Sequence, residues 1–266
     1  MKNLQITGLA FVIALLLVPA LEAQSTLRGM SLNGSTGLYS IPSGRTGWEK
    51  SSSFGLDLGY HAIIRGGAAT NIPKISMSLF KFMELSAALD VQPNGYITPD
   101  KGTDFIGGIK FQLPIASSAI ALGGNFQTLN AGIYNYNAGQ IYAAVTYAGQ
   151  LFNMPAETSV VLGKTFKEKN TNWDIDFGMG FDLILLPRQL GRFVHWVSDF
   201  ANFSYSVEAF GADALYRGVF NTGLRIDLSA IPDLSKFKFV IDVFVTDVLD
   251  KGRAFSLGAV FGVPVL

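Results

Sequence analysis

The chain has 266 residues, of which 49% are hydrophobic and only 15% are Asp, Glu, Lys or Arg, and it contains 29 glycines. Soluble domains usually have about 25% charged residues and about 7% glycine, so an ordinary water-exposed surface is excluded. The net charge is zero, which excludes the basic field typical of a nucleic-acid-binding protein.

Residues 1–23 have the order of a secretory signal peptide. A positive Lys2 precedes the apolar run LAFVIALLLVPA at 9–20, and the small Ala23 ends the segment. The run is shorter than the roughly 20 residues that a transmembrane helix needs, so we expect export and cleavage after Ala23. An uncleaved anchor is the alternative, because Leu21 stands where the cleavage site prefers a small residue.

Residues 24–50 are predicted to be a lead-in or plug-like segment. The stretch GSTGLYSIPSGRTGWEK at 34–50 is rich in glycine, which permits close approach of the backbone to neighbouring groups. Partial alternation at Leu38, Ser40 and Pro42 argues against a linker. We expect the segment to lie in a barrel lumen or against its periplasmic rim, with Trp48 anchoring the entry to the first strand.

Residues 51–266 show the period-2 alternation of strands, and no apolar run after Pro19 reaches the ~18 residues of a membrane helix. The stretch WDIDFGMGFDL at 173–183 places large apolar side chains on one face and aspartate or glycine on the other. Twelve such segments are predicted: 54–62, 71–80, 84–92, 104–113, 119–129, 140–149, 158–166, 173–183, 202–210, 220–228, 237–247 and 254–265.

One connection departs from alternation. In 187–201, Leu190, Phe193, Val194 and Val197 are spaced at i, i+3, i+4 and i+7, which predicts a short amphipathic helix. If the N-terminus is periplasmic, this helix would lie at the periplasmic interface or pack against the end of the barrel, with His195 on its polar face.

The pattern favours an all-β fold, a transmembrane antiparallel β-barrel of about 12 strands. A water-soluble sandwich would bury the face that carries several aspartates, at a prohibitive cost. In an outer-membrane barrel the apolar face meets lipid and the polar face meets the lumen. The predicted localisation is therefore the bacterial outer membrane, with outer-membrane lipid as a partner.

The registers place mostly acidic side chains in the lumen, which would favour cations if the lumen is open. Paired charges filling a closed lumen are the alternative. The candidate lumen-lining residues are Asp57, His61, Glu84, Asp90, Lys110, Asp174, Asp176, Asp182, Glu208, Arg225, Asp227, Lys238 and Asp242, and Lys74 has the same parity.

Catalytic and metal-binding motifs are scarce. Cysteine is absent, so there is no disulfide, thiolate ligand or acylated N-terminal cysteine. His61 could form an acid/base pair with Asp57, although no serine or second carboxylate is placed near it by spacing. We expect no enzyme activity, no cofactor and no metal, and a lipid hydrolase is the third hypothesis for function.

Two local motifs resemble those of known outer-membrane proteins. The final segment AFSLGAVFGVPVL resembles the C-terminal strand by which barrels are delivered to the barrel-insertion machinery. Gly37, Leu38, Pro42 and Arg45 resemble the opening motif of YjbH-type barrels, and ISMSLFKFMELSAALD resembles their strand–turn–strand unit. This resemblance implies a link to exopolysaccharide export or biogenesis.

The leading prediction for function is a passive channel, or porin, for small solutes with an acidic lumen. The alternative is a closed-lumen structural or surface-interaction barrel, with the polysaccharide link as its suggested context.

Overall fold

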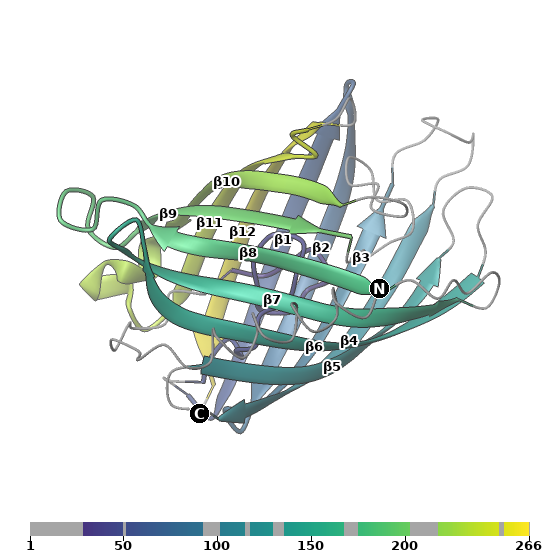
Figure 1. The fold of residues 1–266 in the computed structure, drawn as a ribbon, viewed down its shortest axis with the longest axis horizontal. Coiled ribbons are helices and arrows are strands. Elements are labelled where there is room, and N and C mark those ends of the chain that lie inside the picture. Colours follow the sequence, from purple (N-terminus) through teal and green to yellow (C-terminus); the bar gives the residue numbers. More distant parts are fainter. Residues whose placement is uncertain are drawn as a thin grey trace, which may run out of the picture.

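The protein forms a closed β-barrel of twelve antiparallel strands (Figure 1). The computed structural model describes residues 29–49, 52–92, 102–114, 118–129, 136–167, 175–202, 218–249 and 253–265. The strands are β1 (Phe54–Arg65), β2 (Ala68–Leu79), β3 (Met83–Val91), β4 (Thr103–Pro114), β5 (Ser118–Leu129), β6 (Tyr136–Leu151), β7 (Met154–Lys167), β8 (Asp176–Ile184), β9 (Val194–Ala201), β10 (Val219–Asp227), β11 (Lys238–Thr246) and β12 (Ala254–Pro264).

Pairing between β1 and β12 closes the ring, because each remaining strand pairs with its neighbours in sequence. Closure leaves no free edge, so the backbone polar groups of every strand are bonded along both sides. The predicted fold class and the number of strands are confirmed. Within the described residues no helix is long and apolar enough to cross a membrane.

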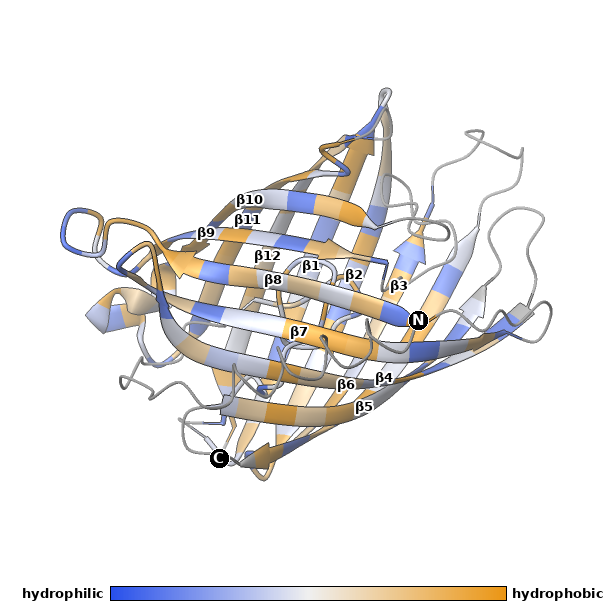
Figure 2. Ribbon diagram, in the orientation of Figure 1, coloured by the Kyte–Doolittle hydropathy of each residue, from blue (hydrophilic) through white to orange (hydrophobic). Residues whose placement is uncertain are grey.

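Alternation along the strands separates two surfaces (Figure 2). On the outer surface the exposed side chains are large and apolar, including Leu58, Leu122, Phe126, Leu162 and Leu257. Their sequence neighbours point inward and are buried, as Asp57 beside Leu58 in β1 and Ala121 beside Leu122 in β5 show. An apolar outer belt around a polar interior is the arrangement that a lipid environment stabilises.

The predicted helix at 187–201 is wrong. Residues 187–193 form turns, and Val194–Ala201 is strand β9, paired with β8 and β10. The sequence VHWVSDFA also alternates, and pairing on both sides satisfies all of its backbone groups, which outweighs the helical spacing. Gly191, at φ +64°, turns the chain before the strand begins.

Within the described residues the helical elements are two short 3₁₀ turns, η1 (Leu228–Ala230) and η2 (Pro232–Leu234). The predicted strand at 202–210 lies, beyond Asn202, outside the described residues. The structure still has twelve strands, because β9, which begins eight positions before the predicted strand, takes its place in the count.

The two ends of the barrel differ. At one end, here called the turn end, short connections join β2 to β3 and β6 to β7. At the other, the loop end, longer connections at 92–102 and 202–218 join β3 to β4 and β9 to β10. In bacterial barrels short turns face the periplasm and longer loops face outward, so these four connections favour a periplasmic turn end. The connections at 185–193 and 228–237, also at the turn end, and the two-residue β1–β2 turn at the loop end do not follow this rule.

The β6–β7 turn is tighter than expected from the sequence. It consists of Phe152 and Asn153, both at positive φ (53° and 61°), whereas the predicted strands at 140–149 and 158–166 left a longer connection between them. Two residues at positive φ match the right-handed twist of the flanking strands. The shorter turn extends β7 and brings Glu157 into the wall.

Candidate functional site

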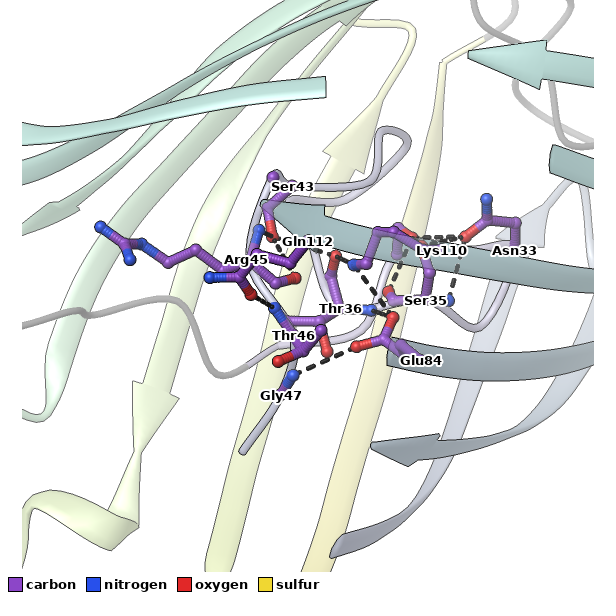
Figure 3. Close-up of polar contacts among 12 residues, drawn as sticks. Asn33, Ser35, Thr36, Ser43, Arg45, Thr46, Gly47, Glu84, Lys110 and Gln112 are labelled. Carbon is purple, nitrogen blue, oxygen red and sulfur yellow. Dashed lines mark hydrogen bonds and ion pairs between the residues drawn. The ribbon is translucent and has the colours of Figure 1, made fainter. Parts of the chain in front are cut away.

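Residues 29–49, the lumen segment, lie inside the ring of strands and are almost entirely buried (Figures 1 and 3). Isolated bridges between Met30 and Thr36 and between Gly37 and Pro42 fold the segment back on itself. Backbone hydrogen bonds within the segment, such as those from the Leu32 N–H to the Tyr39 carbonyl and from the Ser43 N–H to the Thr36 carbonyl, stabilise this fold. The wall of the barrel supplies partners for other backbone groups of the segment.

Two wall carboxylates bind backbone N–H groups of the lumen segment. Glu84 on β3 accepts from Thr36 at 2.8 Å and from Gly47 at 3.1 Å. Asp199 on β9 accepts from the Tyr39 and Ser40 N–H groups at 2.9 and 2.6 Å. Hydrogen bonds to a charged acceptor are stronger than neutral ones, so these four bonds hold the backbone of the lumen segment to β3 and β9.

Two wall lysines bind backbone carbonyls of the same segment. Lys110 Nζ on β4 donates to the Thr36 carbonyl at 3.1 Å and pairs with Glu84 at 3.0 Å (Figure 3). Lys74 Nζ on β2 donates to the carbonyls of Met30 and Ser31 at 3.1 and 2.9 Å. The wall therefore binds both donors and acceptors of the segment's backbone.

Arg225 on β10 is the centre of a buried charge cluster. Its Nε and Nη2 donate to Asp242 on β11 at 2.8 and 3.1 Å, and its Nη1 donates to Asp182 on β8 at 3.3 Å. Nη1 also donates to the Gly37 carbonyl at 3.2 Å, which joins the cluster to the lumen segment. A guanidinium can serve all three acceptors because its donors form a rigid fork.

Each histidine joins this cluster. His61 Nε2 lies 3.4 Å from Asp242, and its Nδ1 lies 2.9 Å from Lys74 Nζ. His195 contacts Asp182 through Nδ1 at 2.6 Å and the Arg192 carbonyl through Nε2 at 2.9 Å. Both groups that face His195 are acceptors, so both of its ring nitrogens donate.

At the turn end, Trp48 connects the lumen segment to β1. Its Nε1–H donates to Asp57 at 2.9 Å, and Lys238 Nζ donates to the other oxygen of Asp57 at 2.6 Å. Lys238 Nζ also lies 5.2 Å from the centre of the indole ring. Arg45 nearby pairs with Glu49 of the segment at 2.7 Å and with Glu157 of β7 at 3.0 Å.

Above these charges the lumen contains an apolar layer. Leu32, Leu38 and Ile41 of the lumen segment pack against inward side chains that include Ile63 and Val161. Tyr39 stacks on Phe244 with ring centroids 4.7 Å apart. Burial raises the pKa of the Tyr39 phenol well above its usual value, so the ring stays neutral.

Most of the candidate lumen residues are buried in this interior. They are Asp57, His61, Glu84, Asp90, Lys110, Asp182, Arg225, Asp227, Lys238 and Asp242. Asp176 is half-buried and accepts from Thr165, and Asp174 and Glu208 lie outside the described residues. The suggested His61–Asp57 pair is wrong, because Asp57 bonds to Trp48 and Lys238, while His61 contacts Asp242 and Lys74.

Sequence reasoning missed Asp199 and Glu157 and gave His195 the wrong surroundings. Asp199 and His195 follow the inward parity of β9, which the helical reading of 187–201 concealed. Glu157 was assigned to a connection because the turn was expected to be longer. In each case alternation in the flanking residues was the available signal.

The lumen segment has further partners among wall residues with neutral side chains. The Gly44 N–H donates to Thr146 Oγ1 at 2.8 Å. The Thr46 N–H donates to Gln112 Oε1 at 2.8 Å, and both residues are labelled in Figure 3. The Asp199 side chain also accepts from Asn221 at 2.8 Å. Contacts with β2, β3, β4, β6, β9 and β10 therefore surround the segment.

No protein-family model matches the sequence, and no curated protein matches it. Among solved structures, the chain is similar to the KdgM porin in complex with disordered oligogalacturonate, with a TM-score of 0.52 and 8% identity over 77% of this chain and 98% of that chain. Acinetobacter baumannii Omp33 has a TM-score of 0.42 and 12% identity, covering 80% of this chain and 98% of that one.

Pseudomonas aeruginosa OprD has a TM-score of 0.33 and 7% identity, covering 87% of this chain and 97% of that one. At sequence identities this low, the likeness supports a shared fold and nothing further. On the strength of the KdgM likeness and the closed ring of twelve strands, this chain has the fold of a porin-type outer-membrane β-barrel.

Proposed function

We propose that this protein is an integral barrel of the bacterial outer membrane that passes small solutes passively when the lumen segment leaves its bound position. The apolar outer belt fits lipid, and the fold is that of a porin-type barrel. The observation that carries the proposal is the mode of binding of the lumen segment. Wall side chains bind its backbone, so it acts as a separable plug rather than as part of the wall.

A passive channel needs no catalytic group, and the contacts of both histidines support this reading over that of a lipid hydrolase. In the part of the chain that the structure describes, their partners are carboxylates, a lysine and a backbone carbonyl rather than a serine hydroxyl. A hydrolytic nucleophile would need a base within hydrogen-bond reach.

The second candidate is a closed-lumen barrel with a structural or surface role, for which surface polysaccharide is the suggested context. The extent of the bonding inside the lumen favours it. Gly37, Leu38, Pro42 and Arg45, which carry the resemblance to YjbH-type barrels, are all buried in the lumen segment. In this reading the motif serves to hold the segment permanently.

Single-channel recording in planar bilayers separates the two candidates. The informative variant is Gly44→Ala, because a Cβ at Gly44 would lie 2.2 Å from the Ala119 carbonyl oxygen and 3.1 Å from that of Ala144. These are backbone atoms of β5 and β6, which cannot move aside, so the lumen segment has to shift. We expect brief openings in the wild type and more frequent openings in the variant.

Gly139→Ala is the matched control, because a Cβ at Gly139 meets nothing within 4 Å. It should behave like the wild type. A second variant without residues 29–48 should show sustained conductance. The absence of single-channel steps in all folded variants would overturn the channel proposal and favour the closed-lumen barrel.

A further inference from the structure

Lys74 on β2 binds the lumen segment and a histidine through the same amino group. Its Nζ donates to the carbonyls of Met30 and Ser31 at 3.1 and 2.9 Å, and it lies 2.9 Å from Nδ1 of His61 on β1. Both Lys74 and His61 are buried. An ammonium group has three N–H donors and no acceptor, so two donors serve the lumen segment and the third serves the ring nitrogen.

The contact between Nζ and Nδ1 holds one proton. Two nitrogen atoms 2.9 Å apart form a hydrogen bond only when one donates and the other accepts. With Lys74 as an ammonium, Nδ1 of His61 is therefore the unprotonated acceptor. A second proton would put a hydrogen on both nitrogen atoms and break the bond. It would also leave two cations side by side in an interior that screens charge poorly.

The other charged groups around His61 already have partners. Asp242 on β11 lies 3.4 Å from Nε2. Arg225 on β10 donates to both oxygen atoms of this carboxylate, at 2.8 and 3.1 Å, so Asp242 is paired without a charge on the histidine. Asp57, also on the inward face of β1, pairs with Lys238 at 2.6 Å.

The surroundings of His61 leave its ring little room to move. A Cβ at Gly258, the opposite residue on β12, would lie 2.4, 2.5 and 2.6 Å from Nε2, Cε1 and Cδ2 of the ring, so the ring packs directly on that backbone. Tyr39 of the lumen segment packs edge-on, with the ring centroids 5.8 Å apart. The stem of Lys74 is flexible by comparison. Repulsion would therefore displace the ammonium group, and the two carbonyls of the lumen segment would lose their donor.

We propose that the contact between His61 and Lys74 makes the binding of the lumen segment pH-sensitive, so that acid releases Met30 and Ser31 from β2. This regulation rests on the proposed channel function. The state in which Lys74 has moved away binds a proton more tightly, so acid favours that state by linkage. One proton changes the ratio of released to bound segment by at most about tenfold per pH unit.

Hydrogen–deuterium exchange of the full-length, detergent-solubilised protein tests the proposal. In the bound segment the N–H groups of Ser31 and Leu32 donate to the carbonyls of Ser35 and Tyr39 at 2.8 and 2.9 Å. Their protection factors are the readout, since these factors are corrected for the intrinsic pH dependence of exchange. Between about pH 7.5 and about pH 4, which covers most histidines in folded proteins, wild-type protection should fall by about tenfold or more.

His61→Asn is the informative variant. Its side-chain oxygen can take the place of Nδ1 and accept from Lys74, but it binds no proton in this pH range. Protection in this variant should therefore stay within about twofold over the same range. Lys74→Gln is the second variant. It should also lose the pH dependence, because a protonated ring nitrogen can donate to the glutamine oxygen.

Asp199→Asn is the matched control, because it removes a titratable carboxylate that binds Tyr39 and Ser40 and leaves the contact of His61 in place. Its protection should be lower at every pH and should still fall in acid. An equal fall in the wild type and in His61→Asn would show that acid acts through other groups, and the proposal would be wrong. Wild-type protection that does not change with pH would also overturn it.

Single-channel recording at the same pH values separates this proposal from the channel function. We expect openings of the wild type to become more frequent in acid and those of His61→Asn to keep their frequency. Acid-dependent protection without single-channel steps at any pH would overturn the channel function and support the pH-sensitive contact. Acid-dependent openings with protection that does not depend on pH would overturn the contact and support the channel.

Discussion

At the scale of single residues, the interior depends on charges that are buried and paired. Arg225 bonds to Asp182, Asp242 and the Gly37 carbonyl, so it joins three strands and the lumen segment. Removing one partner of a buried ion pair leaves an uncompensated charge, which costs more than the pair itself contributes. Arg225 is therefore the residue at which substitution should affect both the wall and the plug.

Arg225→Met should lower the free energy of unfolding by about 3–5 kcal/mol, because two buried carboxylates lose their guanidinium. Urea unfolding in lipid vesicles, followed by tryptophan fluorescence, measures the change. Arg188→Met is the control, since Arg188 is exposed in the connection before β9. Equal unfolding midpoints for the two variants would contradict the importance assigned to the charge cluster.

At the scale of strands, the two faces have opposite requirements. The outward face of β5 carries Leu122 and Phe126, each more than half exposed. Its inward face, toward the lumen segment, carries Ala119 and Ala121, which are fully buried. A large apolar side chain on the outer face stabilises the barrel, because lipid surrounds it there. Small residues inside leave room for the segment.

Leu122→Arg should destabilise the barrel by about 2–4 kcal/mol, because Leu122 lies near the middle of β5 and its side chain would meet the bilayer centre. Leu151→Arg, on the outward face at the turn end of β6, should cost about 0–1 kcal/mol, because it lies near the interface. Unfolding from vesicles compares the two. Similar costs would argue that this outer surface does not meet lipid.

At the scale of the whole molecule, the position of the lumen segment decides whether the interior is open. A Cβ at Gly178 would lie 3.6 Å from the Ile41 Cβ, within the range that a disulfide bridges. The chain has no cysteine of its own, so a single bridge can be introduced without competing thiols.

Ile41→Cys combined with Gly178→Cys should therefore lock the lumen segment to β8 under oxidising conditions. We expect channel openings to disappear in the oxidised protein and to return after reduction with dithiothreitol. Ile41→Cys alone should not respond to the reductant. Openings that persist in the fully oxidised protein would show that solutes pass without displacement of the segment.

The alternation of residues was enough to predict an all-β barrel with twelve strands, because a strand in such a wall exposes each face to one environment only. Where two periodicities coexist the sequence was ambiguous. Residues 194–201 satisfy both, and the pairing of β9 with β8 and β10 decided for the strand. The two-residue β6–β7 turn was also decided by pairing, since its Phe152 is an unusual residue at positive φ.

The sequence by itself determined which side chains face lipid and which face the interior, because that depends only on parity along each strand. Tertiary structure alone decided the partners: Asp57 with Lys238, Glu84 with Lys110 and Asp199 with the backbone of Tyr39 and Ser40. These pairs join residues far apart in the chain, and local spacing carries no information about which strands a closed ring and its lumen segment bring together.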